Sequence, residues 1–195
     1  MTLAETDVEE AIVATLVSEP AVPITSKTGS SGWTASVGSG GGPGADPATI
    51  VFQKTRIQPT CQMHSVAFTN NRGIPVELII RTWQKSDRSL VVAPVGGGSQ
   101  GGAPVRTKPW VNFAAQWGPE HFAAGGHVEG SGSEQAVNVR LIFTDGYTLE
   151  DSVDAGIVLF FEPRSVVLPA DVEILDEHGE LLTKYKEFDR GPFVK

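Results

Sequence analysis

Few side chains in this sequence could do acid–base or metal chemistry, since its 195 residues include four histidines and one cysteine. His121 and His127 are six positions apart, and Glu120 and Glu129 flank them. A bound metal ion needs several ligands that converge at ~2 Å, and these residues could supply them across a loop. The spacing differs from that of metalloproteases, in which two histidines lie four apart on one helix. His121 and His127 are therefore the candidate metal ligands, but we favour structural histidines and expect neither a metal nor another cofactor.

Cys61 and His64 could in principle form a cysteine–histidine pair. Three positions separate them, and within a strand this odd spacing points the two side chains to opposite faces. The glycine-rich segment 96–102 lacks the Gly-Lys-Ser/Thr sequence of a phosphate-binding loop. A single cysteine also cannot form a disulfide within one chain. These observations lead us to expect a protein that is not an enzyme.

Aromatic side chains are concentrated in the segment 108–122, between prolines and glycines. In an irregular segment, such residues can anchor a protein partner, a sugar ring or a lipid headgroup. Alternatively they cap one end of a core, and three of them follow the i, i+3, i+7 spacing of a buried helical face. The candidate partner-binding residues of this segment are Trp110, Phe113, Trp117 and Phe122.

The N-terminal residues predict one amphipathic helix. Capping-box spacing occurs within residues 6–10, and Pro20 follows the helical pattern. Val8, Ile12 and Leu16 fall on one stripe of this helix. A helix of roughly fifteen residues is too short to be stable alone in water, so we expect the stripe to dock. It docks either on the chain's own sandwich or on another body, a neighbouring subunit or a lipid surface, which makes these three residues further candidates for partner binding.

The rest of the chain has the pattern of antiparallel strands. Alternating apolar residues predict a strand over 137–143, because every second side chain of a strand points to the same face. Five consecutive apolar residues at 157–161 suit a strand that is covered on both faces. The segments 172–175 and 181–185 flank a polar loop and predict a hairpin. We expect an all-β fold: an antiparallel β-sandwich, jelly-roll-like or immunoglobulin-like, with a short N-terminal helix.

Glycine marks the expected division of the chain. The sequence has 22 glycines, and many of them lie with serines between residues 26 and 48. Such a composition is typical of a flexible arm. We therefore predict an N-terminal helix and Gly/Ser-rich arm over 1–48 and a single β-sandwich domain over 49–195.

Charge and hydropathy limit the partners. A formal net charge of −8 without clustered basic residues argues against nucleic acid. The helix lacks the Lys and Arg that favour anionic membranes, and no run approaches the ~18 apolar residues of a membrane span. The first residues do not form a classical signal peptide. We expect a cytoplasmic protein, or part of a particle assembled in the cytoplasm.

The sequence therefore favours a non-catalytic structural or protein–protein interaction protein, a β-sandwich subunit or accessory component of a larger assembly. Its partners would be protein subunits, either copies of itself or an unlike chain. One alternative is a ligand- or membrane-binding module that uses the aromatic segment. Another is a metal-dependent enzyme that uses the two clustered histidines.

Overall fold

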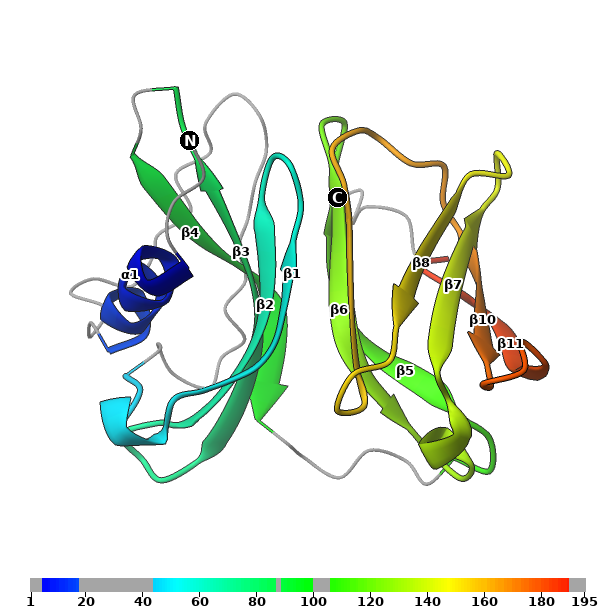
Figure 1. The fold of residues 1–195 in the computed structure, drawn as a ribbon, viewed down its shortest axis with the longest axis horizontal. Coiled ribbons are helices and arrows are strands. Elements are labelled where there is room, and N and C mark those ends of the chain that lie inside the picture. Colours follow the sequence, from blue (N-terminus) through cyan, green and yellow to red (C-terminus); the bar gives the residue numbers. More distant parts are fainter. Residues whose placement is uncertain (1–4, 18–43, 87–88, 100–105, 190–195) are drawn as a thin grey trace. The chain divides into compact units, whose positions relative to one another are not determined.

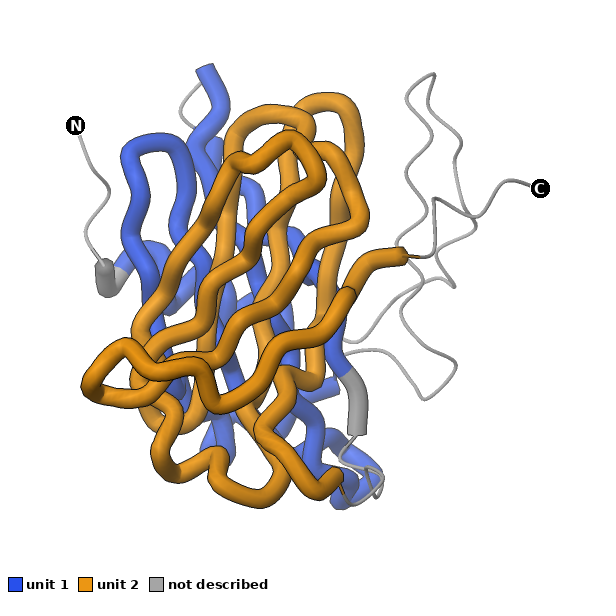
Figure 2. The backbone as a smooth tube through the Cα atoms, turned by 90° about the vertical axis from the view of Figure 1, so that its right-hand side faces the viewer, with its two compact units in different colours: residues 1–102 blue, residues 103–195 orange. Residues whose placement is uncertain are grey.

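The computed structural model describes residues 5–17, 44–86, 89–99 and 106–189. Antiparallel strands dominate, which confirms the predicted all-β class. The chain divides into two compact units, residues 1–102 and residues 103–195 (Figure 2). This division differs from the single sandwich expected over 49–195. The expected boundary at residue 48 falls inside the first unit, because the helix before it packs on the strands after it. Most of the Gly/Ser-rich arm lies outside the described residues.

The first unit is a helix on a four-stranded antiparallel sheet (Figure 1). The strands follow one another in the order β1-β2-β3-β4, each paired with its neighbour in sequence. The elements are α1 (Glu5–Val17), a 3₁₀ turn (Pro47–Thr49), β1 (Val51–Ile57), β2 (Gln62–Thr69), β3 (Pro75–Gln84) and β4 (Leu90–Ser99).

The apolar stripe of α1 builds the core of this unit. Val8, Ile12 and Leu16 are each at most 3% exposed and belong to one cluster with Val66 and Phe68 of β2. The helix therefore docks on the chain's own sheet, which was one of the two alternatives. These three side chains are consequently buried inside the unit and do not present a surface to a partner, which corrects their assignment as partner-binding residues.

The second unit is a sandwich of two antiparallel sheets. One sheet has the order β5-β6-β9 and the other the order β11-β10-β7-β8. Seven strands split three and four match the immunoglobulin-like alternative rather than an eight-stranded jelly roll. The strands are β5 (Trp110–Trp117), β6 (Phe122–Glu129), β7 (Asn138–Phe143), β8 (Thr148–Ser152), β9 (Ile157–Glu162), β10 (Ala170–Leu175) and β11 (Leu181–Glu187), with a 3₁₀ turn (Ser133–Gln135) before β7.

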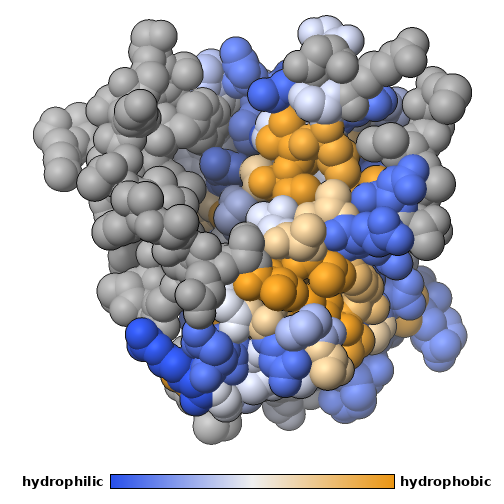
Figure 3. Space-filling view, turned by 90° about the vertical axis from the view of Figure 1, so that its left-hand side faces the viewer, coloured by the Kyte–Doolittle hydropathy of each residue, from blue (hydrophilic) through white to orange (hydrophobic). Residues whose placement is uncertain are grey.

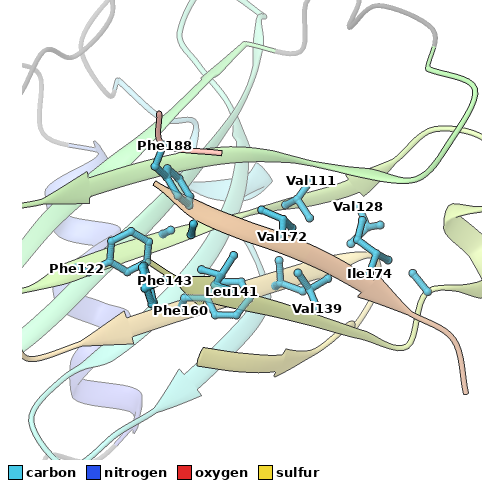
Figure 4. Close-up of a cluster of buried hydrophobic side chains, with 14 residues drawn as sticks. Val111, Phe122, Val128, Val139, Leu141, Phe143, Phe160, Val172, Ile174 and Phe188 are labelled. Atoms are coloured by element: carbon cyan, nitrogen blue, oxygen red, sulfur yellow. The ribbon is translucent and has the colours of Figure 1, made fainter. Parts of the chain in front are cut away.

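Side chains from both sheets meet in the core of the sandwich (Figure 4). On β7 the predicted alternation holds: Val139, Leu141 and Phe143 are at most 2% exposed. Val137, which the alternation also placed in the core, precedes the strand and is 46% exposed. All six residues of β9 are buried, as the apolar run predicted. The hairpin between β10 and β11 is also present.

The docking of α1 can be tested with Ile12→Ala. Removing a fully buried isoleucine from this cluster should lower the free energy of unfolding by about 2–5 kcal/mol, because transfer and cavity costs add. Glu10→Ala, on the exposed side of the same helix, should change it by less than about 0.5 kcal/mol. Urea unfolding followed by circular dichroism measures both. Equal stability of the two variants would contradict the docking of the helix.

Candidate functional site

The aromatic segment forms β5, the turn after it and the start of β6, and no part of it is helical. Phe113 and Trp117 point to the same face of β5 and pack, with the fully buried Phe122, around Phe188. The ring centroids of these three lie 5.1, 5.9 and 5.4 Å from that of Phe188. Three of the four aromatic candidates therefore belong to the core of the sandwich, which was one of the two alternatives for this segment. Their helical spacing was misleading.

Trp110 is the exception among these residues. It lies an odd number of positions from Phe113, so on a strand its side chain points to the opposite face. It is half-buried, and the guanidinium of Arg106 lies 4.1 Å from the centroid of its ring. Trp110 is thus the one aromatic candidate outside the sandwich core, engaged by a cation from its own chain.

The two clustered histidines do not come together. His121 directly precedes β6, and His127 lies on this strand, so the extended backbone separates them by ~20 Å. His121 is 8% exposed and stacks on Phe161 with 6.2 Å between ring centroids. No group of three or more His, Cys, Asp or Glu side chains suited to a metal occurs among the described residues. The geometry therefore contradicts a metal site shared by His121 and His127.

Among the described residues of the first unit, His64 is the most deeply buried titratable side chain. Its two ring nitrogens lie 3.1 Å from Thr55 Oγ1 and 3.3 Å from Thr82 Oγ1, and the ring of Phe52 contacts it edge-on. Burial lowers the pKa of His64 to about 4, so the imidazole is neutral at physiological pH. Thr55 is directly opposite His64 on β1, whereas Thr82 lies diagonally from it on β3, two residues beyond the directly opposite Ile80.

Cys61 is also buried, at the end of the turn before β2. Burial raises the pKa of its thiol to about 12, and the positive charge of Arg81 only partly offsets this. The nucleophilic form of cysteine is the thiolate. A neutral thiol and a neutral histidine do not form the ion pair of a cysteine–histidine catalyst.

A second polar cluster closes one end of the sandwich. The hydroxyl of Tyr147 donates a hydrogen bond to the carboxylate of Glu162, which is only 8% exposed. Arg164 Nε lies 3.2 Å from the other carboxylate oxygen, and its guanidinium carbon lies 4.0 Å from the centroid of the Tyr147 ring. The hydrogen bond to Glu162, together with burial, raises the pKa of Tyr147. The cluster joins the β7–β8 turn to the end of β9 and has a structural role.

Charged side chains form a row across the outer face of the sheet β11-β10-β7-β8. Glu150, Arg140, Glu173 and Lys184 are directly opposite one another on the four strands and alternate in sign. Their ion pairs measure 3.2, 3.4 and 3.0 Å in this order. Because opposite charges neutralise each other along the row, this face has no unbalanced charge to attract an ionic ligand.

A cavity of about 190 Å³ opens at one end of the first unit's sheet. Its lining includes the row Ile57, Gln62 and Thr82, which are opposite one another on β1, β2 and β3. Val8 of α1 and Leu90 of β4 form walls. No local motif in the sequence indicates this cavity, because its residues are far apart in the chain.

No protein-family model, curated protein or solved structure matches this chain. Among the described residues, no helix is both long enough and apolar enough to cross a membrane.

The buried neutral His64 predicts a loss of stability in acid. The unfolded chain binds a proton near pH 6.5, whereas the folded chain binds it only near pH 4. Between these values the unfolded state holds more protons, so the free energy of unfolding falls as the pH falls. The His64→Gln variant, whose amide can still contact both threonines, has no imidazole to protonate. Between pH 7 and pH 4.5 its free energy of unfolding should therefore fall by on the order of 2 kcal/mol less than that of wild type.

Urea unfolding at a series of pH values measures this difference. The carboxylates titrate in both proteins, so only the difference between them reports on His64. Parallel pH profiles for the two proteins would show that His64 takes up its proton equally easily in the folded state.

Proposed function

We propose that this protein is a non-catalytic structural or protein–protein interaction protein, a subunit or accessory component of a larger assembly. The observation that most supports this proposal is the edge strand β4. All ten of its residues are uncharged, and in the described part of the chain it pairs only with β3. Native edge strands usually carry charges that prevent further pairing.

Other edge strands in the two units show this protection. β1 contains Lys54 and Arg56, and β8 contains Glu150 and Asp151. Only β5 resembles β4 in having no charged residue. Within β4, Pro94 and a bulge at the next residue interrupt the strand, which leaves Leu90–Ala93 as its regular part. An extended segment of a partner can add to such an edge through main-chain hydrogen bonds.

The exposed surface of the first unit suits the same proposal. On the side that carries α1, apolar side chains gather between polar ones (Figure 3). The described nucleophile and base, Cys61 and His64, are buried and uncharged, and the charged row of the second unit is paired within itself. These features favour association over catalysis. The proposed setting is the cytoplasm or a particle assembled there, which a free buried thiol suits.

Ala93→Glu tests the role of β4, with a second copy of the chain as the first partner to examine. The new carboxylate would be directly opposite Arg81 of β3, so a cross-strand ion pair should keep stability within about 1 kcal/mol of wild type. It would also place a charge on the edge that a partner must approach. We expect a defined oligomer for the wild-type chain and a shift of at least about tenfold in its dissociation constant for the variant.

Light scattering over a range of concentrations measures this shift. Thr148→Glu adds the same charge to β8, an edge that is already acidic, and should leave association unchanged. A wild-type chain that remains monomeric at every concentration would contradict self-association at β4. If both variants weakened association equally, the cause would be the change in net charge and not the position on this edge.

A further inference from the structure

The second unit has its own uncharged edge strand, β5. Within the part of the chain that the structure describes, β5 has no neighbouring strand other than β6. Asn112 is exposed and residues 113–117 are half-buried, whereas the adjacent β6 is almost entirely buried. β5 therefore keeps accessible surface over most of its length.

The main-chain groups of β5 that point away from β6 belong to alternate residues. In an antiparallel pair, residues that exchange hydrogen bonds with the partner strand alternate with residues whose groups point outward. The amide of Gly118 donates to the carbonyl of His121 over 2.9 Å, which fixes the alternation. Val111 has an outward position, since its amide donates to the hydroxyl of Tyr185 over 2.7 Å. The outward positions that remain are Phe113, Ala115 and Trp117.

The same alternation holds for the regular part of β4. The amide of Lys85 donates to the carbonyl of Ser89 over 2.9 Å, which marks a hydrogen-bonded pair. The next outward positions are therefore Leu90 and Val92. Pro94 continues the series, and it offers a carbonyl but no amide hydrogen. Positions 90, 92 and 94 thus have the same two-residue spacing as positions 113, 115 and 117.

We propose that β4 of one copy of the chain pairs antiparallel with β5 of a second copy, through main-chain hydrogen bonds. None of the side chains of the two strands is charged, so no ion loses its hydration when they meet. This inference rests on the proposed function, because it takes β4 as the edge through which the chain associates. The opposing residues are Leu90–Trp117, Val92–Ala115 and Pro94–Phe113, with Val91–Gln116 and Ala93–Ala114 between them.

The proline of β4 favours β5 over a second β4 as the partner. Two copies of β4 that pair over residues 90–94 would each contribute Pro94, so two main-chain donors would be missing. β5 contains no proline, so all of its outward residues can donate. A contact between two different edges is also head-to-tail. Each copy then offers one edge of each kind, and the copies either close into a ring or continue as a filament.

Gln116→Glu tests β5 with a small change, because it replaces an amide by a carboxylate of similar shape. The new charge would be opposite Val91 of the second copy and should weaken association at least about tenfold. Gln135→Glu makes the same change at an exposed residue of the same unit and should leave association unchanged. Light scattering over a range of concentrations measures association, and circular dichroism checks that each variant folds.

Ala93→Glu and Gln116→Glu should complement each other, because each blocks a different edge. At a concentration at which neither variant associates alone, their equimolar mixture should form a 1:1 complex. Its contact would join the intact β4 of the Gln116→Glu chain to the intact β5 of the Ala93→Glu chain. If identical edges paired instead, one of the two variants would associate alone as tightly as wild type.

Hydrogen exchange of wild type locates the contact without any variant. Between a dilute and a concentrated sample, exchange should slow at the amides of residues 90 and 92 and of residues 113, 115 and 117. These are the donors that face the second copy in the proposed pairing.

The outcomes separate this inference from the proposed function. A wild-type chain that stays monomeric would overturn both. If wild type associates and a folded Gln116→Glu variant associates as tightly as Gln135→Glu, β5 is not the partner, whereas the role of β4 stands. Two further results would overturn the pairing alone: a mixture of the blocked variants that stays monomeric, or unchanged exchange at residues 113–117 when wild type associates.

Discussion

An antiparallel sheet with one apolar face needs a second layer to cover that face, and both units depend on this requirement. In the first unit the second layer is a single helix. Val8, Ile12 and Leu16 of α1 lie in one cluster with apolar residues of β2 and β3. The backbone amide of Ala45 donates to the carbonyl of Leu16 over 3.0 Å, which joins the helix end to the chain that leads into the sheet. In the second unit a second sheet takes the same role.

Buried polar contacts then determine how the layers meet. The hydroxyl of Tyr185 on β11 accepts a hydrogen bond from the backbone amide of Val111 on β5 over 2.7 Å, which links the two sheets of the sandwich. Burial raises the pKa of this tyrosine, so the hydroxyl remains protonated. His64 has a comparable position in the first unit, between threonines of β1 and β3. Each of these polar groups is satisfied only when its strands are in register, so the contacts favour one arrangement of each core.

The surfaces of the two units differ in a way that bears on function. The outer face of the second unit is a row of alternating charges, and such exposed pairs contribute little to stability individually. They keep the face hydrated and electrically balanced. The first unit instead combines an uncharged edge, β4, with a cavity at the end of its sheet. The proposed contact of β4 with a protein strand therefore lies in the first unit.

The sequence by itself determined the elements whose patterns are local. The stripe of α1 and the alternation from Val139 to Phe143 follow from side-chain periodicity, which depends only on neighbouring residues. It did not determine the state of the aromatic segment, because Phe113 and Trp117 share a face on a strand as well as on a helix. The partner of the α1 stripe, the division at residue 102 and the cavity were decided only by tertiary structure. Gln62 acquires its surroundings from Val8, Thr82 and Leu90, and pairings between such distant residues leave no local signal in the chain.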